Sequence, residues 1–255
     1  MDASGDDSRH AGRVGVRLSR HLRGQPALNE PPAQPSEILE RADTARGELV
    51  LRRVGDEFEV ISNGVFLMDT RDGRSERLLV SAAVAVAARP RSLLIGGLGV
   101  GFSLREAVSV AELERIDVVE IEDDIVRWHR SHLRHLTADA LADARVRVVV
   151  GDLADHVAAN RSTYDVICVD VDNGPTWTVT PANDALYDQA GTALLLAAVR
   201  PGGVLAVWSA TPVPAYEQLL RDLGCDVEVC TVPVAPEGAE RADPDVIYLA
   251  RLSAT

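Results

Sequence analysis

From about residue 91 to residue 224, short apolar runs alternate with segments of helical periodicity, and this alternation is the feature that most restricts the fold. The runs expected to be strands are RSLLIGG from 91, RIDVVEI from 115, ARVRVVV from 144, YDVICVD from 164 and GGVLAVW from 202. Strands that are apolar almost throughout and alternate with helices indicate a parallel sheet with helices on both faces. The sequence therefore predicts an α/β fold over residues 76–255.

The segments on either side of this alternation have other patterns. Residues 47–75 predict a small β element, with turns at Gly55-Asp56 and Asn63-Gly64. ERLLVSAAVAVAA from 76 predicts a helix, and DVEVCTV from 226 and DVIYLARL from 245 predict a hairpin.

Residues 1–46 are expected to be a flexible or loosely docked tail, since 25–36 are rich in proline and polar residues. The basic stretch 8–24 leaves a nucleic-acid arm as an alternative, although it has no aromatic residues for stacking on bases.

The net charge and the types of charged residue restrict the partners and the chemistry that this chain can have. The 255 residues carry a net charge of −13, which argues against nucleic acid or an anionic membrane as the main partner. All 26 basic residues are arginine, so a lysine Schiff base and a phosphate-loop lysine are excluded. The start is acidic, the apolar run 78–88 is too short to span a bilayer, and the three cysteines show no C-x-x-C pair. We expect a cytoplasmic protein with a small-molecule substrate, and a homodimer remains open.

A glycine-rich turn follows the first of the predicted parallel strands. In IGGLGVGF, Gly97, Gly99 and Gly101 are spaced GxGxG, and Phe102 stands where the dinucleotide motif needs its last glycine. Ligands bind at the carboxyl ends of the strands in such sheets, and glycines let a ligand approach the backbone. A strand-to-helix turn that simply needs small residues is the alternative interpretation.

Acidic residues follow the next two strands. Glu120 lies near the distance along the chain at which a carboxylate reaches ribose hydroxyls. Glu122, Asp123 and Asp124 are better explained as residues of a helix start. Asp152 is a candidate acceptor for an adenine amino group, or equally an N-cap of the helix 153–159.

Two carboxylates and an indole follow the fourth strand, in VDVDNGPTWTV from 169. Asp170 and Asp172 alternate along the exit and are predicted to face one side. Trp177 is a candidate to line the site with the face of its indole against a sulfonium or ammonium cation. Tyr187 and Asn183 are candidates to line the same site. Asp170 is placed to take a proton from an amine acceptor. A polar turn is the alternative for both acids; we favour function for Asp170 and leave the role of Asp172 open.

Three histidines, His129, His132 and His135, recur at every third residue of what is predicted to be one helix. Arginines among them would repel a metal ion, so we expect no metal site and assign these residues to the helix dipole.

Taken together, the motifs resemble the spermidine synthase-like family of the class I S-adenosylmethionine-dependent methyltransferase fold. The matching segments are the glycine turn with LRE at 104–106, VEIEDDIV at 119–126, DARVRVVVGD at 143–152, YDVICVD at 164–170 and VRPGGVLAVWS at 199–209. The resemblance covers roughly residues 48–252. It implies a Rossmann-like seven-stranded sheet that ends in an antiparallel hairpin, preceded by a small N-terminal β element.

The resemblance also implies roles for particular residues. Gly97, Gly99 and Gly101 would hold the amino-acid end of the nucleoside, and Glu120 with neighbouring Ile121 the ribose. Asp152 with Leu153 would hold adenine, and Asp170 would face the acceptor amine. From their positions after the fourth strand, and not from the resemblance, Asp172, Trp177 and Tyr187 are further candidate acceptor contacts. The implied cofactor is S-adenosylmethionine or its decarboxylated form.

This sequence departs from the family at three places, one of which is the turn after Asp170, where residues 171–175 read VDNGP and the family has a turn that contains serine and aspartate and ends in proline. Val100 stands where the family carries an aspartate for the aminopropyl amine, and of the N-terminal polyamine contacts only Glu76 has a clear match. We therefore expect methyl transfer to a small acceptor, with putrescine a poor one. The alternatives are a polyamine aminopropyltransferase and a non-catalytic nucleoside-binding regulator.

Overall fold

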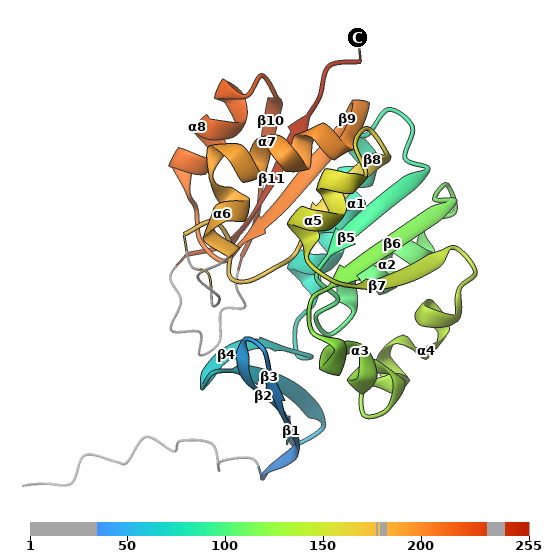
Figure 1. The fold of residues 1–255 in the computed structure, drawn as a ribbon, viewed down its shortest axis with the longest axis vertical. Coiled ribbons are helices and arrows are strands. Elements are labelled where there is room, and N and C mark those ends of the chain that lie inside the picture. The colour runs from blue at the N-terminus through green and yellow to red at the C-terminus, as the bar shows by residue number, and fades with distance from the viewer. Residues whose placement is uncertain (1–34, 177, 179–182, 234–242, 255) are drawn as a thin grey trace, which may run out of the picture. The chain divides into compact units, whose positions relative to one another are not determined.

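A seven-stranded sheet forms the centre of the protein, in the order β10-β11-β9-β8-β5-β6-β7 (Figure 1). The computed structural model describes residues 35–176, 178, 183–233 and 243–254. The strands are β5 (Ser92–Gly96), β6 (Arg115–Glu120), β7 (Val146–Val150), β8 (Tyr164–Val169), β9 (Val199–Ser209), β10 (Asp226–Val232) and β11 (Asp245–Arg251). β5 to β9 are parallel, whereas β11 is antiparallel to both β9 and β10. The predicted Rossmann-like fold with its final hairpin is confirmed.

Helices cover both faces of this sheet. They are α1 (Arg74–Val86), α2 (Phe102–Ser109), α3 (Asp123–Arg130), α4 (Arg134–Ala142), α5 (Leu153–Ala159), α6 (Asp184–Tyr187), α7 (Gln189–Ala198) and α8 (Pro214–Asp222). Neighbouring residues of a strand point to opposite faces, so Ile95 packs in one core and Leu94 in the other. The core around Ile95 includes residues of α1 to α4, and the core around Leu94 includes residues of α5 to α8. No described helix is long and apolar enough to cross a membrane.

A separate four-stranded antiparallel sheet precedes α1. Its strands are β1 (Ser36–Thr44), β2 (Gly47–Val54), β3 (Glu57–Ser62) and β4 (Val65–Asp69), paired in sequence order. Leu49, Leu51 and Val60 of this sheet belong to the same core as Ile95. The small β element predicted from residue 47 is therefore present.

The predicted tail is wrong for residues 36–46, because β1 pairs with β2 along its length. This edge strand carries charged residues at four of nine positions, including Glu37 and Arg41, and has a register shift between Ile38 and Glu40. Both features obscure the alternation by which a strand is recognised. The basic stretch 8–24 lies outside the described residues.

The periodicity of residues 123–136 and of residues 183–199 predicts one helix for each segment, but both segments are divided in two. Between α3 and α4, the Ser131 hydroxyl donates to the carbonyl oxygen of Arg127 at 3.1 Å, a bond that competes with the backbone ladder. Between α6 and α7, Oδ1 of Asp188 accepts from the Gly191 N–H at 2.8 Å and caps α7. The three histidines consequently lie on two helices and the turn between them.

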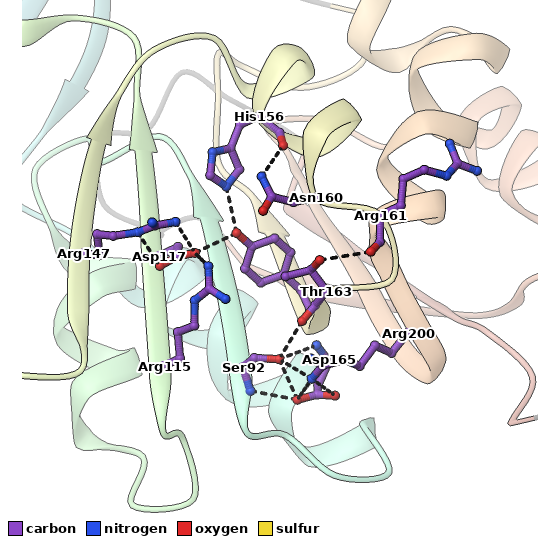
Figure 2. Close-up of polar contacts among 11 residues, drawn as sticks. Ser92, Arg115, Asp117, Arg147, His156, Asn160, Arg161, Thr163, Asp165 and Arg200 are labelled. Carbon is purple, nitrogen blue, oxygen red and sulfur yellow. Dashed lines mark hydrogen bonds and ion pairs between the residues drawn. The ribbon is translucent and has the colours of Figure 1, made fainter.

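Buried polar groups join the parallel strands away from their carboxyl ends (Figure 2). Asp117 of β6 is fully buried, pairs with Arg115 and Arg147, and accepts from the Tyr164 hydroxyl at 2.7 Å. That hydroxyl also lies 2.7 Å from Nε2 of His156. At the amino end of β8, Asp165 bonds Ser92 and Arg200. Every buried charge here has partners, as folding stability requires.

Candidate active site

A cavity of about 780 Å³ opens at the carboxyl ends of the parallel strands. Its walls come from the ends of β5, β6 and β8, the start of α1 and the strand β4. The predicted site residues that line it are Gly97, Gly99, Gly101, Glu120, Ile121, Asp152, Leu153, Asp170, Asp172 and Asn183. The volume is in the range of pockets that hold small molecules.

The glycine turn is shaped by close packing. Gly97 and Gly101 have φ values of +91° and +90°, which side chains rarely adopt. A Cβ on Gly97 would lie 2.2 Å from the carbonyl oxygen of Asp170, and one on Gly101 would lie 2.3 Å from Cγ2 of Thr137. Both glycines are therefore needed for the turn to pack, and the same turn exposes Gly97 and Gly99 to the cavity.

Glu120 ends β6 and is 5% exposed. Its Oε2 accepts from the Leu98 N–H at 2.9 Å, and its Oε1 accepts from the Glu122 N–H at 2.8 Å. Burial raises the pKa of this carboxyl, while the backbone donors act in the opposite direction. Glu120 thus links the glycine turn to the loop after β6, and each oxygen has a lone pair for a further donor.

Asp152 caps α5. Its Oδ1 accepts from the N–H groups of Ala154 and Asp155, at 2.7 and 3.3 Å. The carboxylate is exposed and lines the cavity. One oxygen is therefore used as a cap, and the other can accept from a ligand.

Asp170 is held at the end of β8 by groups from two other elements. Its N–H donates to the Gly96 carbonyl oxygen at 2.9 Å, and the Ser103 hydroxyl donates to its Oδ2 at 2.8 Å. Burial raises the pKa of Asp170 to about 6, and the bond from Ser103 opposes this rise. A carboxyl that titrates near neutral pH can both accept and release a proton under working conditions.

Glu76 is a second carboxyl of the same wall. Burial, and then the negative charge of Asp170, raise its pKa to about 7. It lies in the first turn of α1, and both residues line the cavity. The sequence indicated Glu76 only through the family resemblance, since no pattern brings residues 76 and 170 together.

Three more residues were predicted to lie near the acceptor: Asp172, Tyr187 and Trp177. Asp172 lines the cavity, but its φ of +55° interrupts the extended alternation expected after Asp170. The prediction that Tyr187 lines the cavity is wrong. Its buried ring packs against Tyr216, and its hydroxyl donates to the Val171 carbonyl oxygen at 2.6 Å. It supports the loop after β8 and does not line the cavity. Trp177 lies outside the described residues.

The N-terminal sheet also contributes residues that sequence reasoning missed. Arg46, beside β1, donates to Oε1 of Glu122 and to the Ile121 carbonyl oxygen, both at 2.7 Å. Sδ of Met68 would lie 3.3 Å from a Cβ on Gly99. Both side chains line the cavity. Neither position carries a local motif, so only the folded arrangement reveals them.

Comparisons with known proteins identify relatives of this chain. The chain is 36% identical over 134 residues to polyamine aminopropyltransferase 2 of Pseudomonas aeruginosa, covering 51% of this chain and 36% of that protein. It is 31% identical over 179 residues to the polyamine aminopropyltransferase of Mycobacterium tuberculosis, covering 69% of this chain and 33% of that protein. It is 38% identical over 117 residues to putrescine N-methyltransferase 3 of Nicotiana tabacum, covering 46% of this chain and 29% of that protein. The chain thus spans about a third of the length of these relatives.

Solved structures support the same fold. A spermidine synthase in complex with the transition-state analogue AdoDATO superposes with a TM-score of 0.71 at 16% identity, covering 86% of this chain and 74% of that one. Spermidine synthase from Thermotoga maritima superposes with a TM-score of 0.68 at the same identity and coverage. The family described as the spermine/spermidine synthase domain matches residues 74–238. This chain belongs to the spermine/spermidine synthase family.

Proposed function

We propose that this chain transfers an aminopropyl group from decarboxylated S-adenosylmethionine to an amine acceptor. The observation that carries the proposal is the pair of carboxyls, Glu76 and Asp170, in the cavity wall, with pKa values raised to about 7 and about 6. A diamine is a cation near neutral pH, and it binds best where negative charge is concentrated. The same carboxylates can receive the proton that the amine must lose before it attacks.

Further acids support a cationic acceptor. Asp69, Asp72 and Asp245 also line the cavity, near the ends of β4, α1 and β11. The sequence led us to expect that putrescine is a poor acceptor, and these acids argue against that expectation. Asp69 and Asp72 are far from Asp170 and Asp245 in the sequence, so the fold is needed to show that all of them line one cavity.

The charge of the cavity also affects which form of the donor can bind. Among the described residues that line it, the cations are Arg46 and Arg74, and these pair with Glu122 and Asp72. The carboxylate of intact S-adenosylmethionine would therefore meet an excess of acids and no unpaired cation. The decarboxylated donor has no such group, and its amine would be attracted.

The protein does not need to form a covalent bond with either substrate for this transfer. The sulfonium of the donor supplies an electrophilic carbon and a good leaving group. The acceptor nitrogen would attack the aminopropyl carbon next to sulfur, forming a C–N bond as the C–S bond breaks. The electron pair of that bond stays on sulfur and gives methylthioadenosine, and the proton of the nitrogen passes to Asp170. Asp170 would orient the amine, and Glu120, Asp152 and the glycine turn would hold the nucleoside.

Methyl transfer to an amine is the second candidate. It is favoured by the similarity to putrescine N-methyltransferases and by Val100, which offers no charge to an aminopropyl amine. The sequence alone made this the preferred activity. We now rank it second, because the polyamine aminopropyltransferases match a longer segment and the cavity wall is acidic.

The two activities give different products. The purified chain is incubated with putrescine and with either intact or decarboxylated S-adenosylmethionine, and both products are identified by mass spectrometry. Aminopropyl transfer yields methylthioadenosine and spermidine, whereas methyl transfer yields S-adenosylhomocysteine and a methylated diamine. Diamines with shorter and longer chains test the acceptor length. Nucleoside binding without turnover of any amine would favour the non-catalytic regulator.

A further inference from the structure

His129 of α3 is buried directly behind the glycine turn, and its side chain is bonded at both ring nitrogens. It is 1% exposed, with Nε2 2.9 Å from the carbonyl oxygen of Gly99 and Nδ1 2.7 Å from Oγ1 of Thr137. The assignment of this histidine to a helix dipole, made from the sequence, does not account for two such contacts.

The contacts determine the protonation of the ring. Burial lowers the pKa of His129, so the imidazole is neutral and carries one N–H. A carbonyl oxygen can only accept, so the proton lies on Nε2, which donates to Gly99. Nδ1 then accepts from the Thr137 hydroxyl, which fixes the plane of the ring.

The bond to Gly99 also orients the next N–H group. In a trans peptide the C=O and the N–H that follows it point in opposite directions. With the Gly99 carbonyl directed at His129, the Val100 N–H is directed away from α3. Val100 lines the cavity, and none of the described residues accepts from its N–H. The peptide therefore has an unbonded donor that points away from α3, at a residue that lines the cavity.

Thr137, which bonds His129, also packs against the glycine turn directly. Its Cγ2 would lie 2.3 Å from a Cβ on Gly101, so α4 packs directly against the glycine. His129 and Thr137 thus support the turn at two points, Gly99 and Gly101, from two helices.

We propose that His129 is a positioning residue for the donor, which holds the Gly99–Val100 peptide so that the Val100 N–H meets an acceptor oxygen of the bound nucleoside. This role rests on the proposed function, because it requires a nucleoside at the glycine turn. His129 acts through the backbone and does not touch the donor. Without it, the Gly99 carbonyl loses its partner and the peptide is free to rotate about the flexible glycine.

The test compares variants that differ in one hydrogen bond. His129→Leu removes the donor to Gly99 at similar volume, whereas His129→Gln keeps an N–H₂ near the position of Nε2. We expect His129→Leu to weaken binding of methylthioadenosine about tenfold by calorimetry, and His129→Gln to restore affinity to within about threefold of wild type. KM for the donor should rise in His129→Leu while KM for the amine stays unchanged.

His156→Leu is the matched control. It also removes a hydrogen-bonded histidine, here one whose side chain lies against the Tyr164 hydroxyl (Figure 2). Tyr164 begins β8, whereas the glycine turn follows the carboxyl end of the parallel strand β5. It should lower stability and leave methylthioadenosine affinity unchanged. Hydrogen exchange without ligand adds an independent readout, since the Leu98 and Gly101 amides should exchange faster in His129→Leu only.

The possible results separate the two proposals. Equal affinity of His129→Leu and wild type would overturn the role of His129 and leave the proposed function intact. An equal loss in His156→Leu would also overturn it, because the effect would then be general destabilisation. Failure of the wild-type protein to bind any adenosyl compound would overturn the proposed function, and the role of His129 with it.

Discussion

The Ser103 hydroxyl lies 2.8 Å from Oδ2 of Asp170, so the helix that follows the glycine turn also holds the carboxylate at the end of β8. A donor to an ionised carboxylate stabilises its charge, and this bond opposes the burial that raises the Asp170 pKa to about 6. The Ser103 contact thus adds to the backbone bond between Asp170 and Gly96 in joining the end of β8 to the glycine turn region.

Removing this contact should shift the pH dependence of the reaction. Ser103→Ala leaves burial to act alone, so the pKa of Asp170 should rise further. Because the ionised form accepts the proton of the amine, the acidic limb of kcat/KM should move to higher pH, by roughly half a unit or more. Ser109→Ala, at the exposed end of the same helix, is the control. An unchanged limb would show that Asp170 does not govern it.

Asp170→Asn should separate binding from turnover. Asn keeps the size and can still accept from Ser103, but it takes no proton from the acceptor. We expect affinity for methylthioadenosine to be retained and kcat to fall by about 10²–10⁴, the usual contribution of a positioned general base. Asp165→Asn, at the opposite end of β8, should lower stability and leave kcat near wild type. If Asp170→Asn keeps the full rate, the two acids after β8 are only a polar turn.

Glu120→Ala should weaken nucleoside binding. The variant loses the acceptor of the Leu98 and Glu122 N–H groups and the lone pairs available to ribose hydroxyls. A hydrogen bond to a charged group contributes about 1.5–3 kcal/mol, so the affinity for methylthioadenosine should fall roughly tenfold or more by calorimetry. Asp117→Asn alters another buried carboxylate of β6 and should leave the affinity unchanged. Equal affinity of Glu120→Ala and wild type would remove Glu120 from the site.

Much of the architecture could be predicted from the sequence, because parallel strands buried on both faces leave a long apolar signal. β5, β6 and β8 are examples, and Glu120, which ends β6, and Asp170, which follows β8, could be placed at the cavity for the same reason. Edge strand β1 was missed because its charged residues mask the alternation.

Tertiary contacts were harder to predict. Tyr187 was expected at the cavity because it follows the loop after β8, but the break at Asp188 lets its ring pack into the core beside Tyr216. His129 was interpreted from its helix alone, and its contact with Gly99 depends on how α3 packs against a turn 30 residues earlier. Such contacts join distant parts of the chain and leave no local pattern.

Glu76→Gln should raise the stability of the folded protein at alkaline pH. The pKa of Glu76 is raised from an ordinary 4.5 to about 7, first by burial and then by the charge of Asp170. Between these values the folded state binds more protons than the unfolded chain, so the free energy of unfolding falls as pH rises through this window. Above this pH window, the free energy of unfolding of the wild-type protein is lowered by the full cost of ionising the buried Glu76 carboxyl.

Gln has the same size and no charge, so the variant avoids this cost. We expect it to be more stable than wild type at pH 8 by on the order of 1–3 kcal/mol, and about equally stable at pH 4.5. Urea unfolding at both pH values measures the difference, with the exposed Glu112→Gln as control. The same substitution should raise KM for a diamine, because it removes one of the carboxylates that attract it. A variant that is less stable than wild type by the same amount at both pH values would show that Glu76 is an ordinary structural residue, and it would remove the carboxyl pair on which aminopropyl transfer was proposed.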